Sequence, residues 1–295
     1  MKRFLSRFDA DAVFEAARSA LDEGRLDDAE AKFQDIVRSG EVGPATWFNL
    51  GLIHKFRHDW AAARDANLRC LDLEPGNHEA TWNLGVVATA LRDWSTARNA
   101  WRDLNIDVGT GDGAPETDLG PAPVRLNADS DGGGEVVWGT RIDPCRVRID
   151  SVPLPESGHR WGDIVLHDVV PRGQRLFNGR ALSVFDELER MEPCEAATHV
   201  GEVAWASQDD EDALHTELAA RNLGGEDWST SIQMICSACS LSDAQGHEHD
   251  GVAAPQVAVH RWAFAGDTLE ITEALRSWAS NGGGRRVVLT PPEVA

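Results

Sequence analysis

Three alanines, Ala29, Ala63 and Ala97, stand 34 residues apart, and the residues around each recur in the same order. A period of this length is typical of stacked helix-turn-helix units. Small residues at fixed positions let the two helices of a unit approach closely, and larger apolar residues fill the space between successive pairs. Since no single pair buries its apolar face alone, the period predicts an array of helical hairpins in the first third of the chain.

The residues around these alanines identify the kind of repeat. The second unit has its aromatic residue, leucine-glycine pair, alanine and closing proline at Trp47, Leu50, Gly51, Ala63 and Pro75. The third unit repeats the pattern with Trp82, Leu84, Gly85, Ala97 and Trp101, and the first is degenerate, with Ala16, Ala17 and Phe33. Residues 10–107 therefore resemble the tetratricopeptide-repeat (TPR) family. The resemblance implies an all-α TPR helical array in residues 1–106, with repeats at 10–43, 44–77 and 78–106.

The resemblance also implies a binding groove. In TPR proteins the fifth, sixth and ninth residues of each first helix line the concave face, which here are Phe14, Glu15, Arg18, Phe48, Asn49, Leu52, Trp82, Asn83 and Val86. A stripe of aromatic rings flanked by amides fits an extended or helical apolar segment of a partner. The alternative is that the protein's own linker or C-terminal part covers the stripe. The TPR subtype that grips an acidic C-terminal peptide needs several cations on this face, and because only Arg18 and Lys55 are available we do not expect it.

The charge of the chain argues against two classes of partner. Its 295 residues carry a net charge of −21, and a field of that sign repels phosphate backbones and anionic membrane surfaces. We therefore expect a protein partner, with no membrane binding and no nucleic-acid binding. An acidic chain whose lysines are Lys2, Lys32 and Lys55, with 11 tryptophans and no tyrosine, is typical of a GC-rich bacterial genome. Acidity of this kind is most simply explained by a solvated surface.

The N-terminal residues and the cysteines indicate a cytoplasmic protein. Asp9, Asp11 and Glu15 interrupt the apolar run that a signal peptide needs. No stretch approaches the roughly 18 apolar residues of a membrane span. Five cysteines, an odd number, favour a reducing compartment over a framework of disulfides.

Residues 107–134 read as an acidic linker rich in glycine and proline. Within it, residues 119–127 contain Pro121, Pro123, Val124 and Leu126, so we expect this stretch to lie extended against a neighbouring surface. The TPR groove is one candidate for that surface.

Residues 135–193 change from helical to alternating periodicity. Strands are predicted over 135–142, 145–154, 163–171 and 175–184. The Asn178-Gly179 dipeptide is the strongest hairpin signal in the chain. Four strands in so short a segment predict a small β-barrel or curled sheet.

Residues 194–295 read as two β-α-β halves. The predicted elements are a strand at 199–206, a helix at 209–222 and a strand at 230–236, then a strand at 256–265, a helix at 268–280 and a strand at 285–290. This βαββαβ order predicts an α+β ferredoxin-like domain, a fold that hosts many functions. An RNA-binding version needs cations and aromatic residues on the sheet, and the strands offer Trp205 and Trp262 with few cations.

A cluster of metal-ligand residues lies in the connection between these halves. We predict a structural zinc site formed by Cys236, Cys239, His247 and His249. Two thiolates and two imidazoles can close a tetrahedral site, and Asp243 or Asp250 is an alternative to one histidine. The other interpretation is a buried Cys236 followed by a solvated loop. Redox chemistry is not expected because no helix follows the CxxC pair, and covalent haem attachment is not expected because Ser240 stands where it requires histidine.

Motifs of catalysis are weak. The chain has no phosphate-cradling GxxxxGK[ST] and no nucleophile-elbow GxSxG, and we interpret His167-Asp168 as structural. We therefore predict a non-enzymatic adaptor or scaffold that holds a partner peptide or helix in the TPR groove and carries a zinc-stabilised C-terminal domain. One alternative is a metalloenzyme, a zinc hydrolase whose site keeps an open position for water and whose array recruits substrate. Another is a structural subunit of a larger bacterial assembly.

Overall fold

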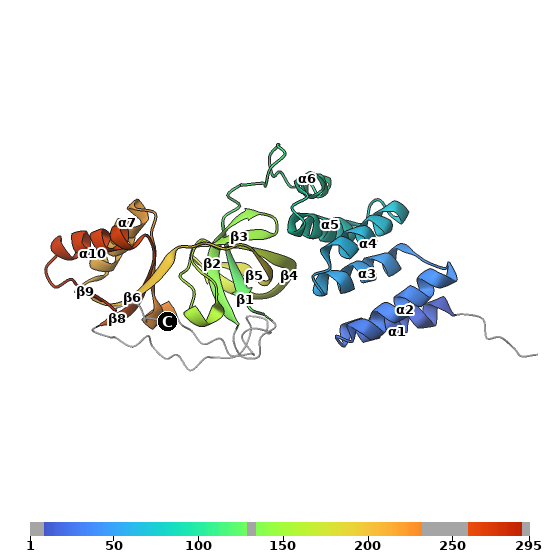
Figure 1. The fold of residues 1–295 in the computed structure, drawn as a ribbon, viewed down its shortest axis with the longest axis horizontal. Coiled ribbons are helices and arrows are strands. Elements are labelled where there is room, and N and C mark those ends of the chain that lie inside the picture. The colour runs from blue at the N-terminus through green and yellow to red at the C-terminus, as the bar shows by residue number, and fades with distance from the viewer. Residues whose placement is uncertain (1–8, 129–133, 232–258, 291–295) are drawn as a thin grey trace, which may run out of the picture. The chain divides into compact units, whose positions relative to one another are not determined.

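The computed structural model describes residues 9–128, 134–231 and 259–290. The chain divides into two compact units, Met1–Thr117 and Asp118–Ala295. All described elements of the first unit are helices, and all described strands belong to the second unit (Figure 1).

Three helical hairpins make up the first unit. They are α1 (Ala10–Asp22) with α2 (Leu26–Ser39), α3 (Pro44–Phe56) with α4 (Trp60–Leu73), and α5 (His78–Ala90) with α6 (Trp94–Asp103). The first helices of the hairpins start 34 residues apart, as the repeat predicts. Four helix starts are fixed by side chains that accept a hydrogen bond from a backbone N–H of the first turn, those of Asp9, Asp59, Asn77 and Asp93.

Glycines at the leucine-glycine positions decide how closely the helices of a hairpin approach. A Cβ placed on Gly85 would lie 2.4 Å from the indole of Trp101, which is fully buried. In the middle hairpin a Cβ on Gly51 would lie 2.8 Å from the side chain of Asn67. These two glycines therefore let a side chain of the second helix lie directly on the backbone of the first.

Five strands of the second unit close into a barrel. They are β1 (Pro121–Leu126), β2 (Glu135–Asp143), β3 (Arg146–Ile149), β4 (Ile164–Phe177) and β5 (Arg180–Glu192), with a 3-10 helix at Pro155–Ser157 before β4. Successive strands pair antiparallel, and β1 pairs parallel with β5 at Val124 and Arg125, which closes the ring. The buried apolar residues of the barrel are Ala122, Val124, Leu126, Val137, Val147, Ile149 and Val165.

Strand β1 lies inside the segment that the composition predicts to be a linker. The stretch is extended, as expected, but the surface it lies against is formed by β2 and β5 of its own unit. Pairing with β5 involves only Val124 and Arg125, which come after both prolines of the strand. Because proline cannot donate a ladder hydrogen bond, the strand could not be recognised from its composition. Burial of three alternate apolar side chains holds it in place.

The turn between β4 and β5 is the one predicted from Asn178-Gly179. Both residues have a left-handed backbone, with φ of 48° and 75°, as a two-residue type I′ hairpin turn requires. Strand β4 continues through residues 172–174, where the sequence pattern predicts a break between two strands. Shifts of register around Pro171 and Gly173 allow this passage.

The remaining strands form a four-stranded sheet of order β7-β8-β6-β9, in which all neighbours are antiparallel. The elements are β6 (Ala197–Ala204), α7 (Gln208–Ala220), β7 (Gly224–Asp227), α8 (Trp228–Ser231), β8 (His260–Gly266), α10 (Thr268–Ser280) and β9 (Arg286–Leu289). Their order along the chain and the bounds of both long helices agree with the sequence pattern within two residues.

Both faces of this sheet are covered near its centre. Trp262 and Phe264 of β8 pack into a core with residues of α7 and α10. Ala263, on the opposite face, packs in a second core with Val152 and Trp228. Val152 lies between β3 and β4, so the barrel region supplies part of the layer that covers this face of the sheet. Trp228 Nε1 donates a 2.9 Å hydrogen bond to the backbone carbonyl of Val152.

The strand predicted over 230–236 is wrong at its start, because residues 228–231 form α8 and the paired strand is β7, at 224–227. Strand β7 begins with two glycines, a residue that is rare in strands. A Cβ on Gly224 would lie 2.7 Å from the ring of Trp161, and one on Gly225 would lie 2.3 Å from Leu218. Close approach of these side chains therefore explains why glycine occupies the strand.

Candidate functional site

The predicted groove positions lie on α1, α3 and α5, and these helices are neighbours: α1 contacts α3, and α3 contacts α5. Phe14, Phe48 and Trp82 occupy equivalent places on them, and each is half-buried. The ring of Phe14 packs edge-on against Phe33, with centroids 5.5 Å apart, and that of Trp82 packs against Trp101 at 5.2 Å. The second helix of a hairpin thus fixes the ring on its first helix in these two repeats.

The two amides beside the rings have different partners. Asn49 Nδ2 donates to the carbonyl of Ala45 in its own helix at 2.7 Å. Asn83 Oδ1 accepts a 3.3 Å hydrogen bond from Lys55 Nζ, and both of these side chains are buried. The amide on α3 is therefore better placed than that on α5 to accept a hydrogen bond from an incoming backbone.

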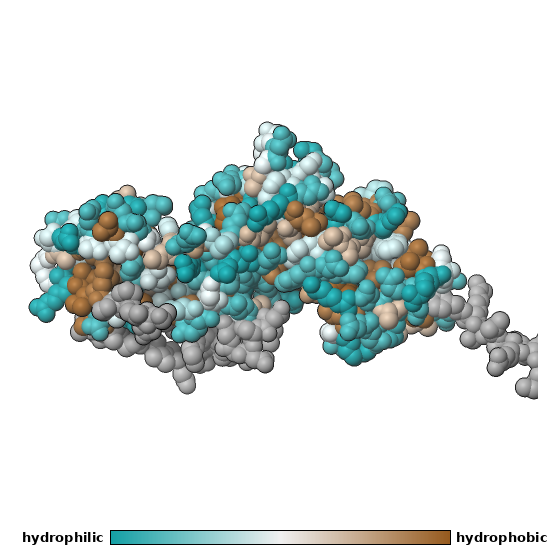
Figure 2. Space-filling model, viewed as in Figure 1, coloured by the Kyte–Doolittle hydropathy of each residue, from teal (hydrophilic) through white to brown (hydrophobic). Residues whose placement is uncertain are grey.

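Exposure falls along the groove positions from the first hairpin to the third. Arg18 is 51% exposed and lies 3.9 Å from Glu15, an ion pair of little energetic consequence at the surface. Leu52 is half-buried, and Val86 is fully buried. Figure 2 shows apolar residues gathered among hydrophilic ones over the array. At the sixth and ninth positions the accessible side chains are thus those of α1 and α3, whereas the rings at the fifth position are half-buried on all three helices.

The His167-Asp168 pair lies in the barrel and is closed to solvent. His167 is 1% exposed, and its Nδ1 lies 2.6 Å from the backbone carbonyl of Asp168. Burial, together with the charge of Arg141, lowers the pKa of His167 to about 4, so the imidazole is neutral. The carboxylate of Asp168 accepts from the N–H of Val169 at 2.7 Å. These contacts agree with the structural interpretation of the pair.

A histidine-carboxylate pair that the sequence did not reveal joins β7 and β8. His260 Nδ1 lies 2.6 Å from Asp227 Oδ2, and the two side chains are 17% and 6% exposed. The ring of His260 stacks on Trp205 with centroids 4.0 Å apart. Asp227 and His260 stand 33 residues apart, so only the antiparallel pairing of β7 with β8 could have revealed them.

The predicted zinc ligands Cys236, Cys239, His247 and His249 lie outside the described residues. Across residues 9–128, 134–231 and 259–290, no group of three or more histidine, cysteine or acidic side chains is arranged to hold a metal ion. None of the helices in those ranges has the length and apolar character needed to cross a membrane.

A family model supports the assignment of the array. The family model described as tetratricopeptide repeat matches residues 2–44 and 14–55, which include α1, α2 and most of α3. Among solved structures, the first TPR of Spaghetti (RPAP3) bound to the HSP90 peptide SRMEEVD is 16% identical, with a TM-score of 0.31, over 32% of this chain and 75% of that one. MamA is 20% identical, with a TM-score of 0.31, over 32% of this chain and 56% of its own.

A hypothetical protein from Neisseria gonorrhoeae is 11% identical, with a TM-score of 0.20, over 55% of this chain and 84% of that one. The assignment itself rests on the family model, on the 34-residue period and on the three hairpins. The first unit is therefore assigned to the tetratricopeptide-repeat family, and the assignment extends to no other part of the chain.

Proposed function

We propose that this protein is an adaptor that binds a segment of a partner protein on the groove positions of α1 and α3. The observation that carries the proposal is the row of half-buried aromatic rings at equivalent places on adjacent first helices. Rings held by packing offer a large contact area at little further loss of side-chain entropy. The Asn49 amide beside Phe48 can pair with the backbone of an extended or helical segment.

Site-specific photo-cross-linking inside the cells that naturally express the protein tests the proposal. A benzophenone amino acid replaces Phe48 in one variant and Leu68, which is 41% exposed on α4, in the control. We expect a cross-link to another protein from position 48 and none to that protein from position 68. Cross-links from position 48 that join only residues of this chain would show that the groove is self-covered and would overturn the proposal.

A matched pair of truncations measures the contribution of the ring. Phe48→Ala removes the aromatic contact, whereas Leu68→Ala removes a similar apolar group from a helix outside the groove. We expect the first variant to lose capture of the cross-linked partner and the second to retain it. Equal capture by both variants would contradict a role for the ring.

We further infer that residues 194–295 adopt a ferredoxin-like sandwich. The order β7-β8-β6-β9, the antiparallel pairing of neighbours and the core shared by α7 and α10 support it. The proposal makes this domain a second docking element of a non-enzymatic, cytoplasmic adaptor.

For the segment between α8 and β8 we propose a structural zinc ion held by Cys236, Cys239, His247 and His249. The proposal rests on the ligand types and their spacing. Metal analysis of protein purified without added zinc tests it, with a Cys236→Ser, Cys239→Ser double variant as control. We expect about one zinc per chain, lost in the double variant, and absence of metal from both samples would refute the proposal.

A further inference from the structure

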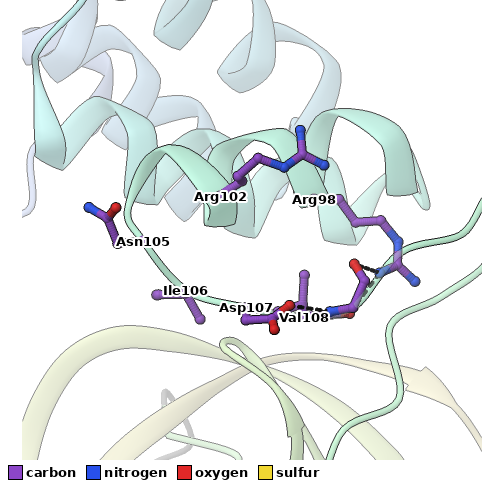
Figure 3. A pocket seen from close by; sticks show the side chains of 7 residues that line it. Arg98, Arg102, Asn105, Ile106, Asp107 and Val108 are labelled. Carbon is purple, nitrogen blue, oxygen red and sulfur yellow. Dashed lines mark hydrogen bonds between the residues drawn. The ribbon is translucent and has the colours of Figure 1, made fainter.

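A pocket of about 300 Å³ lies at the end of the array, between α6 and the loop after it (Figure 3). Volumes of this size are at the lower end of those of small-ligand sites. Its walls are formed by Arg98, Arg102, Asn105, Ile106, Asp107, Val108 and Gly109. All seven residues belong to the first unit, and none is a groove position.

Arg98 places a buried positive charge on one wall. Its side chain is 8% exposed and runs from α6 to the loop. Its Nη1 donates to the carbonyls of Val108 and Gly109 at 2.7 and 2.8 Å, and its Nη2 donates to that of Gly113 at 3.0 Å. These three bonds use three of the five N–H groups of a guanidinium, and Nε is buried without a partner.

No carboxylate within the described residues neutralises this charge by an ion pair. The contrast with the preceding repeat is informative, because Arg64 occupies the equivalent position of α4. Arg64 is 36% exposed and pairs with Asp65 at 3.0 Å. At this repeat position the arginine is thus exposed in the second repeat and buried in the third, where its hydrogen bonds go to backbone carbonyls alone.

The accessible donors of the pocket belong to Arg102 and Asn105. Arg102 is exposed and donates one hydrogen bond, to Asn99 Oδ1 at 2.8 Å. Asn105, also exposed, has a left-handed backbone with φ of 61°. The carboxylate of the pocket, that of Asp107, accepts from the N–H of Gly109 at 2.9 Å. Two guanidiniums and one carboxylate thus line the pocket, in a chain whose net charge is −21.

We propose that this pocket binds an oxyanion, the carboxylate or phosphate group of a small ligand or of a chain terminus. Arg102 and Asn105 supply the hydrogen bonds, since guanidinium and amide N–H groups suit planar or tetrahedral oxyanions. Arg98 supplies a fixed positive charge that its own partners do not neutralise. Because burial weakens screening by solvent, this charge acts on a nearby anion more strongly than a surface charge does. Ile106 adds an apolar wall for the group that bears the anion.

Calorimetric titration of the full chain tests the proposal. The probes are sodium phosphate, sodium acetate, hexa-alanine and hexa-alanine amide, all at one ionic strength set with sodium chloride. Arg102→Gln removes the exposed charge, and Arg64→Gln is the matched control at an exposed arginine of the preceding repeat. Arg98→Gln is a further variant, but because it removes three bonds to the loop, the conclusion depends on Arg102→Gln.

We expect saturable binding that Arg102→Gln weakens about tenfold, the effect of one charge-assisted hydrogen bond, and that Arg64→Gln leaves unchanged. Binding of hexa-alanine but not of its amide would assign the site to a chain terminus, and preference for phosphate would assign it to a phosphorylated small molecule. The absence of saturable binding by every probe, or equal weakening by the two variants, would overturn the proposal.

Discussion

Gly85→Ala tests whether close approach of α5 and α6 determines the stability of the third repeat. The Cβ of alanine would lie 2.4 to 2.6 Å from three ring atoms of Trp101. The ring is fully buried and also packs against Trp82, 5.2 Å away between centroids. It therefore has no open side toward which it can move without separating the two helices.

Two opposing effects set the magnitude. Alanine inside a helix is more favourable than glycine by about 1 kcal/mol. Forcing a methyl group into a filled core costs about 1–3 kcal/mol, and expulsion of the indole approaches the roughly 3–5 kcal/mol of a tryptophan truncation. Since contacts below 3.0 Å with a rigid ring cannot relax locally, we expect the upper part of this range and a net destabilisation of about 2–3 kcal/mol.

Hydrogen exchange of the full chain at low urea concentration measures this loss where it occurs. Protection should fall in α5 and α6 and remain unchanged in the strands of the second unit. Gly76→Ala is the control, because a Cβ there has nothing within 4 Å and the residue does not have a left-handed backbone. Gly85→Ala with Trp101→Leu should be less destabilised than the sum of the single variants. Unchanged protection in Gly85→Ala would refute the reasoning.

Three further predictions concern single side chains. Asn67 is buried, and its Oδ1 has no hydrogen-bond partner. Asn67→Leu should therefore raise the free energy of unfolding by about 1–3 kcal/mol, measured as a higher midpoint of urea unfolding. A lowered midpoint would contradict this. Gly179 has φ of 75°, so Gly179→Ala should lower the melting temperature through a backbone strain of about 1–2 kcal/mol. The control is Gly158→Ala, at a left-handed turn outside the hairpin, which should leave the amide protection of β4 and β5 unchanged. Desolvation by burial raises the pKa of Glu135 from 4.5 to about 7. The folded state therefore favours the protonated acid, so the stability that Glu135 contributes below pH 4.5 is lost as the pH rises through 7. Glu135→Gln should flatten this part of the curve of melting temperature against pH. An unchanged curve would exclude Glu135 as the cause.

The helices and the β4–β5 turn could be predicted because each depends on a local pattern. Gly24 and Gly40 have left-handed backbones at the ends of α1 and α2, and Asn178-Gly179 forms the turn that its residue types require. Strands β1 and β7 could not be predicted in the same way. Their residues, prolines in one and glycines in the other, are those that strands usually lack. Both are held by contacts with segments distant in the sequence, which a local pattern does not contain.

The pocket beside α6 shows the same limit within the array itself. Glu30, Arg64 and Arg98 occupy one position of the repeat, and the period predicts correctly that all three lie on second helices. The period carries no information about the segment beyond the last helix, and the carbonyls that bind Arg98 come from that segment. A repeat position therefore specifies where a side chain is placed, whereas its neighbours outside the repeat determine its chemistry. If Arg98 belongs to an oxyanion site, that site exists because the array ends at the third hairpin, and a fourth hairpin placed after α6 would abolish it.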